Sequence, residues 1–541
     1  MRLKRSPTMF RVELQLLGYR KDLHMRLHFK LRAGAALRGL TIALASLYIG
    51  GVSAEPSLSV ETRRVWSYPH AQSNVPGQKA EIVAYDERGD TLWVAGVAGV
   101  DVLARDTGKW IRNISVAPYG AVNSVAIHEG LAALAVEASD RTQPGVVLFI
   151  NTRTGQRVGD PVTVGALPDM VTFAPNGRMA LVANEGTPNP RTSGQPCPAD
   201  PPGSVSLIDL WTRNVTTLPI SPTLPGYGEL RQFPATGNGT TRPDMCPYDP
   251  EPEYIAVDPR GDKAYVGLQE ANGVAVLDLR TRRFERVIGL GLKDFNLPGN
   301  GIDPNDQDGV VKLEQVPVKG LYQPDSIAAY EHRGRTYLVM ANEGDARDNG
   351  SNDGEDERRG SAGNSSVEYV PDGSLLGRLT MSNVESSRGN LVSFGGRSFS
   401  IRDAAGRAGF DRGNPLDAAG RIVFDSGNQL DAEAISRGVY DHGRSDNKGV
   451  EPEGVAWMHI DGRVLAFIGL ERTTKSAIAI YDVTNPFAAQ FLDMIVSDGD
   501  LSPEGLTALR ARGRNYLAVA NEVSDTTSLF EIRLRQRFAF H

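Results

Sequence analysis

The chain has 541 residues, of which 40% are hydrophobic and 58 are glycine, a composition typical of a β protein with many glycine turns. Residues 1–54 have the pattern of a signal segment and carry 10 basic and 2 acidic residues. Without them, 48 basic and 63 acidic residues remain, so the net charge of the mature chain is about −15. This excess of acid disfavours nucleic acid, because phosphate contacts need clustered Lys and Arg, and it favours cations, with simple solubility as the alternative reason for it.

The N-terminal segment predicts a secretory signal. Basic residues from Arg26 to Arg38 precede an apolar run over residues 40–51, and Val52-Ser53-Ala54 has the small residues of a cleavage site. Residues 1–24 are atypical of a signal, so Met25 is a candidate for the true start. The run is too short to predict a membrane span. We expect a protein that is periplasmic or secreted after cleavage near Ala54, with no membrane span in its mature domain, residues 55–541.

A repeat unit of two apolar strands joined by a glycine-containing turn occurs seven times in the mature chain. Five copies begin with a Pro-acid pair and end in a glutamate, with an interval of 16 to 18 residues between the two acids. Two degenerate copies precede them, near residues 81–96 and 123–137. The opening acids are Asp169, Glu253, Asp325, Glu453 and Glu504, and the closing acids are Glu185, Glu270, Glu343, Glu471 and Glu522.

A third apolar strand follows each repeat unit, and a weaker fourth strand follows most of them, as at residues 283–288. Three to four strands per repeat, at a basic period of roughly 45 residues, are typical of a β-propeller, whose blades stack around an axis. We therefore predict an all-β, seven-bladed β-propeller. The strand-like residues 58–66 belong to no repeat, so we expect them to supply the outer strand of the last blade and to close the ring.

Strand directions in a propeller place the start of the first strand and the end of the second strand on one rim. The long insertions fall on the same face, and loops of such length are usually functional or disordered. Cys197 and Cys246 lie in two of them, and in an exported chain we expect a disulfide between them, with buried free thiols as the alternative. The insertions are residues 186–203, 217–251, 290–323, 344–391 and 404–451.

The acids of the repeat units should accordingly ring one end of the central channel. Like charges at close range repel unless a cation, an arginine or backbone N–H groups share the site, so the ring predicts a site for Ca²⁺ or a similar hard cation. For any single acid the alternative is a structural role, in which the carboxylate caps a turn. The candidate ligands are Asp169, Glu185, Glu253, Asp325, Glu343, Glu453, Glu471, Glu504 and Glu522.

A second acidic motif lies in the insertion at residues 290–323. Asp303, Asp306 and Asp308 stand at near-alternating positions before Gly309, as in a calcium loop, although the terminal Glu of an EF-hand is missing. These three aspartates are further candidate ligands for a metal ion. An acidic, solvated turn is the alternative.

Arginines at the same rim predict an anionic ligand. Arg347 follows Glu343 and Asp345 in the fifth repeat, and Arg472 follows Glu471 in the sixth. An arginine on an acidic, cation-bearing face suits a phosphate or a carboxylate, with pairing to the neighbouring acids as the alternative. The sequence has no Gly-x-Ser-x-Gly, His-Glu-x-x-His or Cys-x-x-Cys motif, so hydrolysis would have to use a metal-bound water.

Motifs across residues 75–534 are specific when they are taken together. They include Tyr322-Gln-Pro-Asp-Ser, Ala341-Asn-Glu-Gly-Asp-Ala-Arg, Glu451-Pro-Glu-Gly-Val and Gly469-Leu-Glu-Arg. These motifs resemble the choice-of-anchor I family, and the shorter repeats are similar to those of lactonase-type propellers. The resemblance implies an exported propeller. Some members of the family are labelled alkaline phosphatase.

Two functions follow, and whether the protein is an enzyme stays open. In the first, the acidic, Ca²⁺-bearing face binds a polar or phosphorylated small molecule or a surface partner. In the second, which the family label implies, the same face is a Ca²⁺-dependent phosphomonoesterase. We favour binding, because the sequence supplies no dedicated nucleophile. For the enzyme, the metal-side candidates are Glu343, Asp345, Glu453 and Glu471, and the candidate phosphate clamps are Arg347 and Arg472.

Overall fold

The fold is that of a computed structural model. It describes residues 57–187, 201–231, 250–346, 360, 370–371, 373–404 and 420–537, together with the short strands at 236–237, 240–241 and 357–359. Residues 58–536 form one compact unit. In the described part of the chain, no helix is long and apolar enough to span a membrane. The predicted signal and both cysteines, Cys197 and Cys246, lie outside the described residues.

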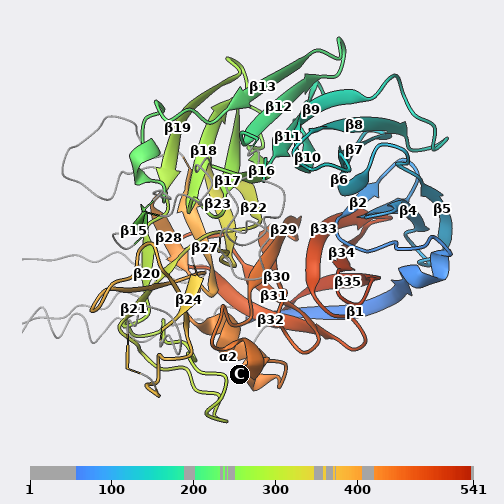
Figure 1. Cartoon of the computed structure of the whole chain (residues 1–541). Helices are drawn as coiled ribbons and strands as arrows, with labels where there is room; N and C mark the ends of the chain where they lie inside the picture. The colour runs from blue at the N-terminus through green and yellow to red at the C-terminus, as the bar shows by residue number, and fades with distance from the viewer. Residues whose placement is uncertain are drawn as a thin grey trace, which may run out of the picture. The chain divides into compact units, whose positions relative to one another are not determined.

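Seven four-stranded antiparallel sheets follow the seven predicted repeats (Figure 1). In six of them the strands pair in chain order, so that each sheet is one blade. The strands of these six blades are β2 (Val83–Asp86), β3 (Thr91–Gly96), β4 (Gly99–Ala104) and β5 (Trp110–Ile114); β6 (Ala121–His128), β7 (Leu131–Glu137), β8 (Pro144–Asn151) and β9 (Val162–Ala166); β10 (Pro168–Phe173), β11 (Met179–Asn184), β12 (Ser204–Asp209) and β13 (Val215–Pro219); β16 (Pro252–Val257), β17 (Lys263–Leu268), β18 (Gly273–Asp278) and β19 (Arg283–Gly289); β22 (Ile327–His332), β23 (Arg335–Asn342), β27 (Ser398–Asp403) and β28 (Ile422–Asp425); β29 (Pro452–Ile460), β30 (Arg463–Leu470), β31 (Ser476–Asp482) and β32 (Gln490–Ser497).

The seventh blade joins the two ends of the propeller. Its strands are β33 (Pro503–Ala511), β34 (Arg514–Asn521), β35 (Thr526–Arg537) and, outermost, the N-terminal strand β1 (Ser57–Pro69). The N-terminal segment therefore supplies the outer strand of the last blade, as predicted. The innermost strands contact one another in the order β2, β6, β10, β16, β22, β29 and β33, and β33 in turn contacts β2.

The hydrophobic core lies between the blades. Strand residues alternate between the two faces of a sheet, and each face is covered by the neighbouring sheet, which is why the strands are apolar on both sides. Val339 of β23 and Ile468 of β30 share one cluster, for example, between the fifth and sixth blades. A further cluster contains Leu92 of the first blade and Ala518 of the seventh. Such clusters occur between each successive pair of blades, including the last and the first.

The insertions build a separate layer beside the fifth blade. Their five-stranded sheet has the order β20 (Leu292–Asp294), β21 (Val318–Leu321), β26 (Leu391–Ser393), β25 (Thr380–Ser382) and β24 (Glu357–Arg359), with β21 and β26 parallel (Figure 1). The other elements of the insertions and connections are α2 (Gln429–Ser436), the strands β14 (Thr236–Gly237) and β15 (Thr240–Thr241), and the 3₁₀ turns η1 (His70–Ser73), η2 (Tyr227–Glu229) and η4 (His442–Arg444).

Buried cations attach this layer to the blade. Lys293 donates to the carbonyls of Gly396, at 2.9 Å, and Gly427, at 2.8 Å. The buried guanidinium of Arg397 donates to the carbonyls of Asp303, at 3.0 Å, and Ser445, at 2.7 Å. Because a buried guanidinium or ammonium group is costly unless its donors are satisfied, these contacts hold the described parts of the insertions in a defined position.

Candidate acidic metal centre

The Pro-acid start of a repeat unit fixes both of its acids at one rim. In the sixth blade, Pro452 pairs with Leu470, and the register shifts directly afterwards, which is the signature of a β-bulge at Glu453. The backbone N–H of Glu471 then donates to the carbonyl of Glu451, at 2.9 Å. The opening and closing acids of the unit are therefore neighbours. The same contact joins the N–H of Glu185 to the carbonyl of Leu167 and the N–H of Glu522 to the carbonyl of Ser502, each at 2.8 Å.

Acids from different blades come close enough to affect one another. Burial raises the pKa of Asp169 to about 8, with a further contribution from Glu185 and from Glu81 of the first blade. Burial likewise raises the pKa of Glu81 to about 7, with a contribution from Glu522 of the seventh blade. The structure thus brings the acids of the repeat units together. Burial first, and neighbouring carboxylates second, also raise the pKa of Glu253, Asp325, Glu453 and Glu504.

Two groups of three carboxylates stand out at this rim. In each, one oxygen from every residue lies within 4.8 Å of the others, a separation that a single cation can bridge. The first group, here called the third-blade triad, is Glu185, Glu253 and Glu270. The second, the Lys448 triad, is Glu343, Glu451 and Glu471.

The third-blade triad joins the third and fourth blades. Burial raises the pKa of Glu253 well above its ordinary value, and the nearby charges of Glu270 and Asp325 raise it further. Among the described residues, no group hydrogen-bonds to Glu253 Oε2, although this atom is buried. Glu185 accepts a hydrogen bond from the Thr187 hydroxyl. A buried carboxylate oxygen without a donor is costly, and a cation would remove that cost.

The Lys448 triad already contains a cation. Lys448 Nζ lies 2.8 Å from Glu343 Oε1 and 3.2 Å from Glu451 Oε2, and Gln269 donates to Glu343 Oε2 at 2.7 Å. Burial alone would lower the pKa of Lys448, but the charges of Glu343 and Glu451 outweigh it and hold the pKa well above its ordinary value. The ammonium group therefore occupies the position between the carboxylates that a metal ion would take.

Two arginines pair with carboxylates of the Lys448 triad. Arg444 Nε donates to Glu451 Oε1 at 2.8 Å, and Arg472 pairs with Glu471 at 2.7 Å. Arg472, a candidate phosphate clamp, is thus engaged by an acid of its own blade. Burial, with Glu343 next, still raises the pKa of Glu471 to about 8. Arg347, the other candidate clamp, lies outside the described residues, whereas Asp345 lies 3.6 Å from Lys448 Nζ.

A small cavity lies where the acidic rim meets the channel. Its volume is about 70 Å³, and its walls include Asp169, Asp325, Glu504 and Tyr254. At roughly 30 Å³ for each water molecule, it has room for about two waters or a partly hydrated ion. Glu504 Oε2 is buried here, and none of the described residues donates a hydrogen bond to it. A larger cavity of about 520 Å³, lined by the innermost strands, shares Tyr254 with it.

The aspartates of the predicted calcium loop belong to neither triad. Arg378 forms a bidentate pair with Asp306, at 2.8 and 2.9 Å. Asp303 Oδ2 accepts a hydrogen bond from the Ser445 hydroxyl at 2.9 Å, and His442 Nε2 lies 3.7 Å from Asp308. These carboxylates hold the insertion layer together through protein partners.

Sequence reasoning gave no role to Lys448, Arg444 and Glu451. One signal for Glu451 is present in the sequence. Two repeats carry an acid on both sides of the proline, Glu251-Pro-Glu253 and Glu451-Pro-Glu453, and these two repeats contribute to the two triads. Lys448 and Arg444 stand in a long insertion without a repeat, so the periodicity carries no information about them.

This chain is similar to solved structures of low sequence identity. Among curated proteins, no sequence matches this chain. Two similar solved structures are the β-propeller domain of Cps50 (Swd1) from Myceliophteria thermophila and a hydrazine synthase of Kuenenia stuttgartiensis. The first is 10% identical, with 87% of this chain and 99% of that chain covered and a TM-score of 0.44. The second is 13% identical, with 86% and 96% covered and a TM-score of 0.43.

The family comparison covers most of the chain. The Choice-of-anchor I domain matches residues 81–486, which are 406 of the 541 residues. The match includes the first five blades, three of the four strands of the sixth blade and both carboxylate triads. The chain therefore belongs to the choice-of-anchor I family.

Proposed function

We propose that the acidic rim of this exported propeller binds a divalent cation, Ca²⁺ in the first place, and presents it to a polar ligand. The observation that carries the proposal is the third-blade triad. Its three carboxylates lie within bridging distance, and Glu253 Oε2 is buried without a donor among the described residues. Ca²⁺ takes six to eight oxygen ligands at about 2.3–2.6 Å, so three carboxylates leave positions for waters and for a ligand.

The Lys448 triad supports this assignment by contrast. It has the same number of carboxylates, whose oxygens also lie within 4.8 Å of one another, but Lys448 supplies the positive charge. A metal ion there would have to displace an ammonium group that has two carboxylate partners. We therefore place the cation in the third-blade triad.

Calorimetric titration of the chelator-treated protein with Ca²⁺ tests the proposal. We expect binding that Glu253→Gln abolishes and that Glu331→Gln, a change to an exposed residue paired with Arg260, leaves intact. If Ca²⁺ is present at about 100 times its dissociation constant, it should also stabilise the protein by about 2.7 kcal/mol. Equal titrations for the two variants would refute the assignment.

An assay of the same Ca²⁺-titrated protein on a phosphate ester distinguishes a binding function from a catalytic one. Hydrolysis of a generic phosphate ester that needs Ca²⁺, and that Glu343→Gln removes, would establish the phosphomonoesterase. Ca²⁺ binding without turnover would establish the binding function. We expect the second result, because the sequence supplies no dedicated nucleophile for the hydrolysis of a phosphate ester.

A further inference from the structure

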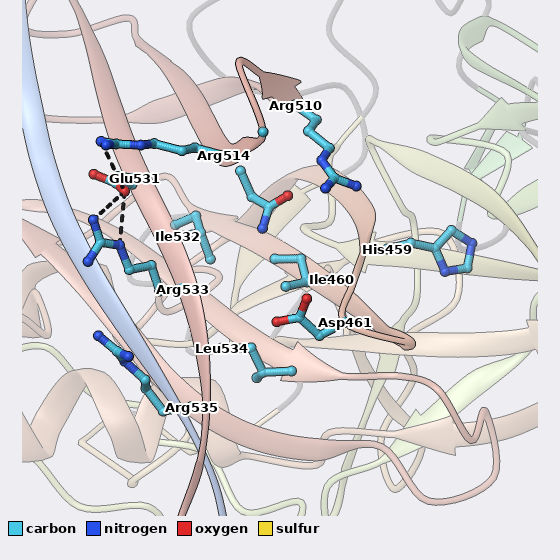
Figure 2. Close-up of a pocket in the computed structure, with 12 residues that line it drawn as sticks. His459, Ile460, Asp461, Arg510, Arg514, Glu531, Ile532, Arg533, Leu534 and Arg535 are labelled. Atoms are coloured by element: carbon cyan, nitrogen blue, oxygen red, sulfur yellow. Dashed lines mark hydrogen bonds and ion pairs between the residues drawn. The ribbon is translucent and has the colours of Figure 1, made fainter.

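Figure 2 shows a second polar cavity. By the strand register, it lies at the end of the blades opposite the acidic rim. Its volume is about 370 Å³, within the range of small-molecule sites. The β29–β30 turn contributes His459 and Asp461, the β33–β34 hairpin contributes Arg510 and Arg514, and the end of β35 closes it. Hairpin pairs such as Arg510 with Asn515 lie at the far ends of strands that begin at the proline of the repeat unit. We call this cavity the arginine pocket.

The charge of the arginine pocket is opposite to that of the protein. Four arginines line it, and a fifth, Arg63 of β1, reaches Glu531 beneath them. Three carboxylates lie within or against the pocket, which leaves an excess of two positive charges in a mature chain whose net charge is about −15. The arginines are Arg63, Arg510, Arg514, Arg533 and Arg535, and the carboxylates are Glu61, Asp461 and Glu531.

Glu531 orients three of these guanidinium groups. It is 2% exposed, whereas Arg63, Arg514 and Arg533 are 61, 58 and 48% exposed. Arg63 lies 2.6 Å from Glu531 Oε2, Arg533 lies 2.7 Å from Oε1, and Arg514 lies 3.7 Å from Oε1. The Arg63 hydrogen bond, with Arg533 next, holds the pKa of Glu531 below its ordinary value. Each guanidinium has five N–H groups, so most of the donors remain free for a ligand.

Arg510 stands apart from this cluster. In Figure 2 it reaches from a different strand than Arg514 and Arg533, without a dashed contact to any residue drawn. Among the described residues it has no ion-pair partner, although it also lines the large cavity of the central channel. An unpaired guanidinium opposite an oriented cluster of guanidinium groups is an arrangement that can bind a doubly charged oxyanion from two sides.

We propose that the arginine pocket binds a phosphate monoester of a small polar molecule. The arginines match the geometry and the charge of the tetrahedral oxyanion, since each guanidinium can donate two parallel hydrogen bonds. The cavity is larger than the oxyanion alone, and Asp461, which also lines it, offers an acceptor for hydroxyl groups of the ester. The site does not depend on the acidic rim, which lies at the other ends of the strands.

Calorimetric titration of the full chain, in chelator, with glycerol 3-phosphate tests the proposal. We expect binding that Arg510→Gln weakens by about tenfold or more, and no binding of glycerol. Arg510→Gln leaves the partners of Glu531 in place, so it should fold normally. Arg283→Gln, an exposed arginine of the fourth blade, and Glu253→Gln should bind as the wild type does.

Two further probes identify the source of the oxyanion. If inorganic phosphate binds as tightly as glycerol 3-phosphate, the pocket recognises the free anion. Vesicles that contain phosphatidic acid, whose headgroup is a phosphate monoester, and that bind through Arg510 would show that a lipid headgroup supplies it. Failure of all three anionic probes to bind at millimolar concentration, or equal affinities for Arg510→Gln and Arg283→Gln, would overturn the proposal.

Discussion

The closure of the ring can be tested at His70, which links the seventh blade to the first. This buried side chain lies 2.7 Å from Asp101 Oδ2 of β4, through Nδ1, and 2.8 Å from the Thr527 hydroxyl of β35, through Nε2. Its backbone N–H also donates to the carbonyl of Asp525 at 2.8 Å. His70→Phe keeps a ring of similar size against Tyr68 but removes both side-chain hydrogen bonds.

The cost follows from what the substitution leaves behind. Asp101 Oδ1 keeps its donors Trp110 and Asn113, at 3.0 and 2.9 Å, but Oδ2 loses its partner. Leaving a buried charged acceptor and a buried hydroxyl unsatisfied should cost about 3–5 kcal/mol. Unfolding of the 479 residues of the compact unit carries an entropy of about 1 kcal/mol/K, so the melting temperature should fall by about 3–5 °C.

Differential scanning calorimetry measures this shift, with His332→Phe on the partly exposed end of β22 as the control. Limited proteolysis adds a second readout, since loss of the link should expose β1 to cleavage before the rest of the chain. The reasoning fails if the melting temperature changes by less than about 1 °C, or by no more than in the control, because His70 would then contribute little to closure.

Three other perturbations test the remaining contacts. Lys448→Met should destabilise the protein by about 3–5 kcal/mol in chelator, because Glu343 and Glu451 lose a buried partner, and added Ca²⁺ should recover part of the loss in thermal melts. The pKa of Asp169 is raised to about 8 and that of Glu81 to about 7, above the unfolded values near 4, so the folded state holds their protons more tightly. The urea midpoint in chelator should therefore fall as the pH rises from about 5.5 to 8.5, and saturating Ca²⁺ should oppose the fall; a midpoint that rises with pH in chelator would contradict this. Deletion of β1 should lower the melting temperature by more than His70→Phe does, since β35 becomes an open edge, and an unchanged melting temperature would show that the ring closes without it.

The fold is largely predictable from the sequence because its repeat is local. In six of the seven blades the strands follow one another in chain order, and in five of the seven the Pro-acid pair marks the start of the innermost strand, as at Pro452-Glu453. Long insertions separate β11 from β12 in the third blade and β23 from β27 in the fifth, yet the apolar residues 204–209 and 398–403 still identified the third strands. Even the outer strand of the seventh blade could be predicted, since residues 58–66 had no repeat to join.

The insertion layer was not predictable in the same way. In its sheet, β21 pairs in parallel with β26, which lies some 70 residues later in the chain. No periodic pattern in the sequence predicts a pairing between segments so far apart. The lysine that fills the second triad comes from the end of an insertion as well. Lys448 is brought to Glu343 by the carbonyl contacts of Arg397 around Ser445 and Asn447, which are tertiary contacts without a local signal.

The contrast between the two triads indicates how this propeller divides its acidic rim. The repeat produces carboxylates at every blade, so it cannot by itself decide which of them bind a cation. We propose that the insertions make that decision. Lys448 of one insertion places an ammonium group in one triad, whereas in the other triad Glu253 Oε2 has no donor among the described residues. On this reasoning Lys448→Met would create a second cation site, and Ca²⁺ titration of that variant should show one more binding event than titration of the wild type.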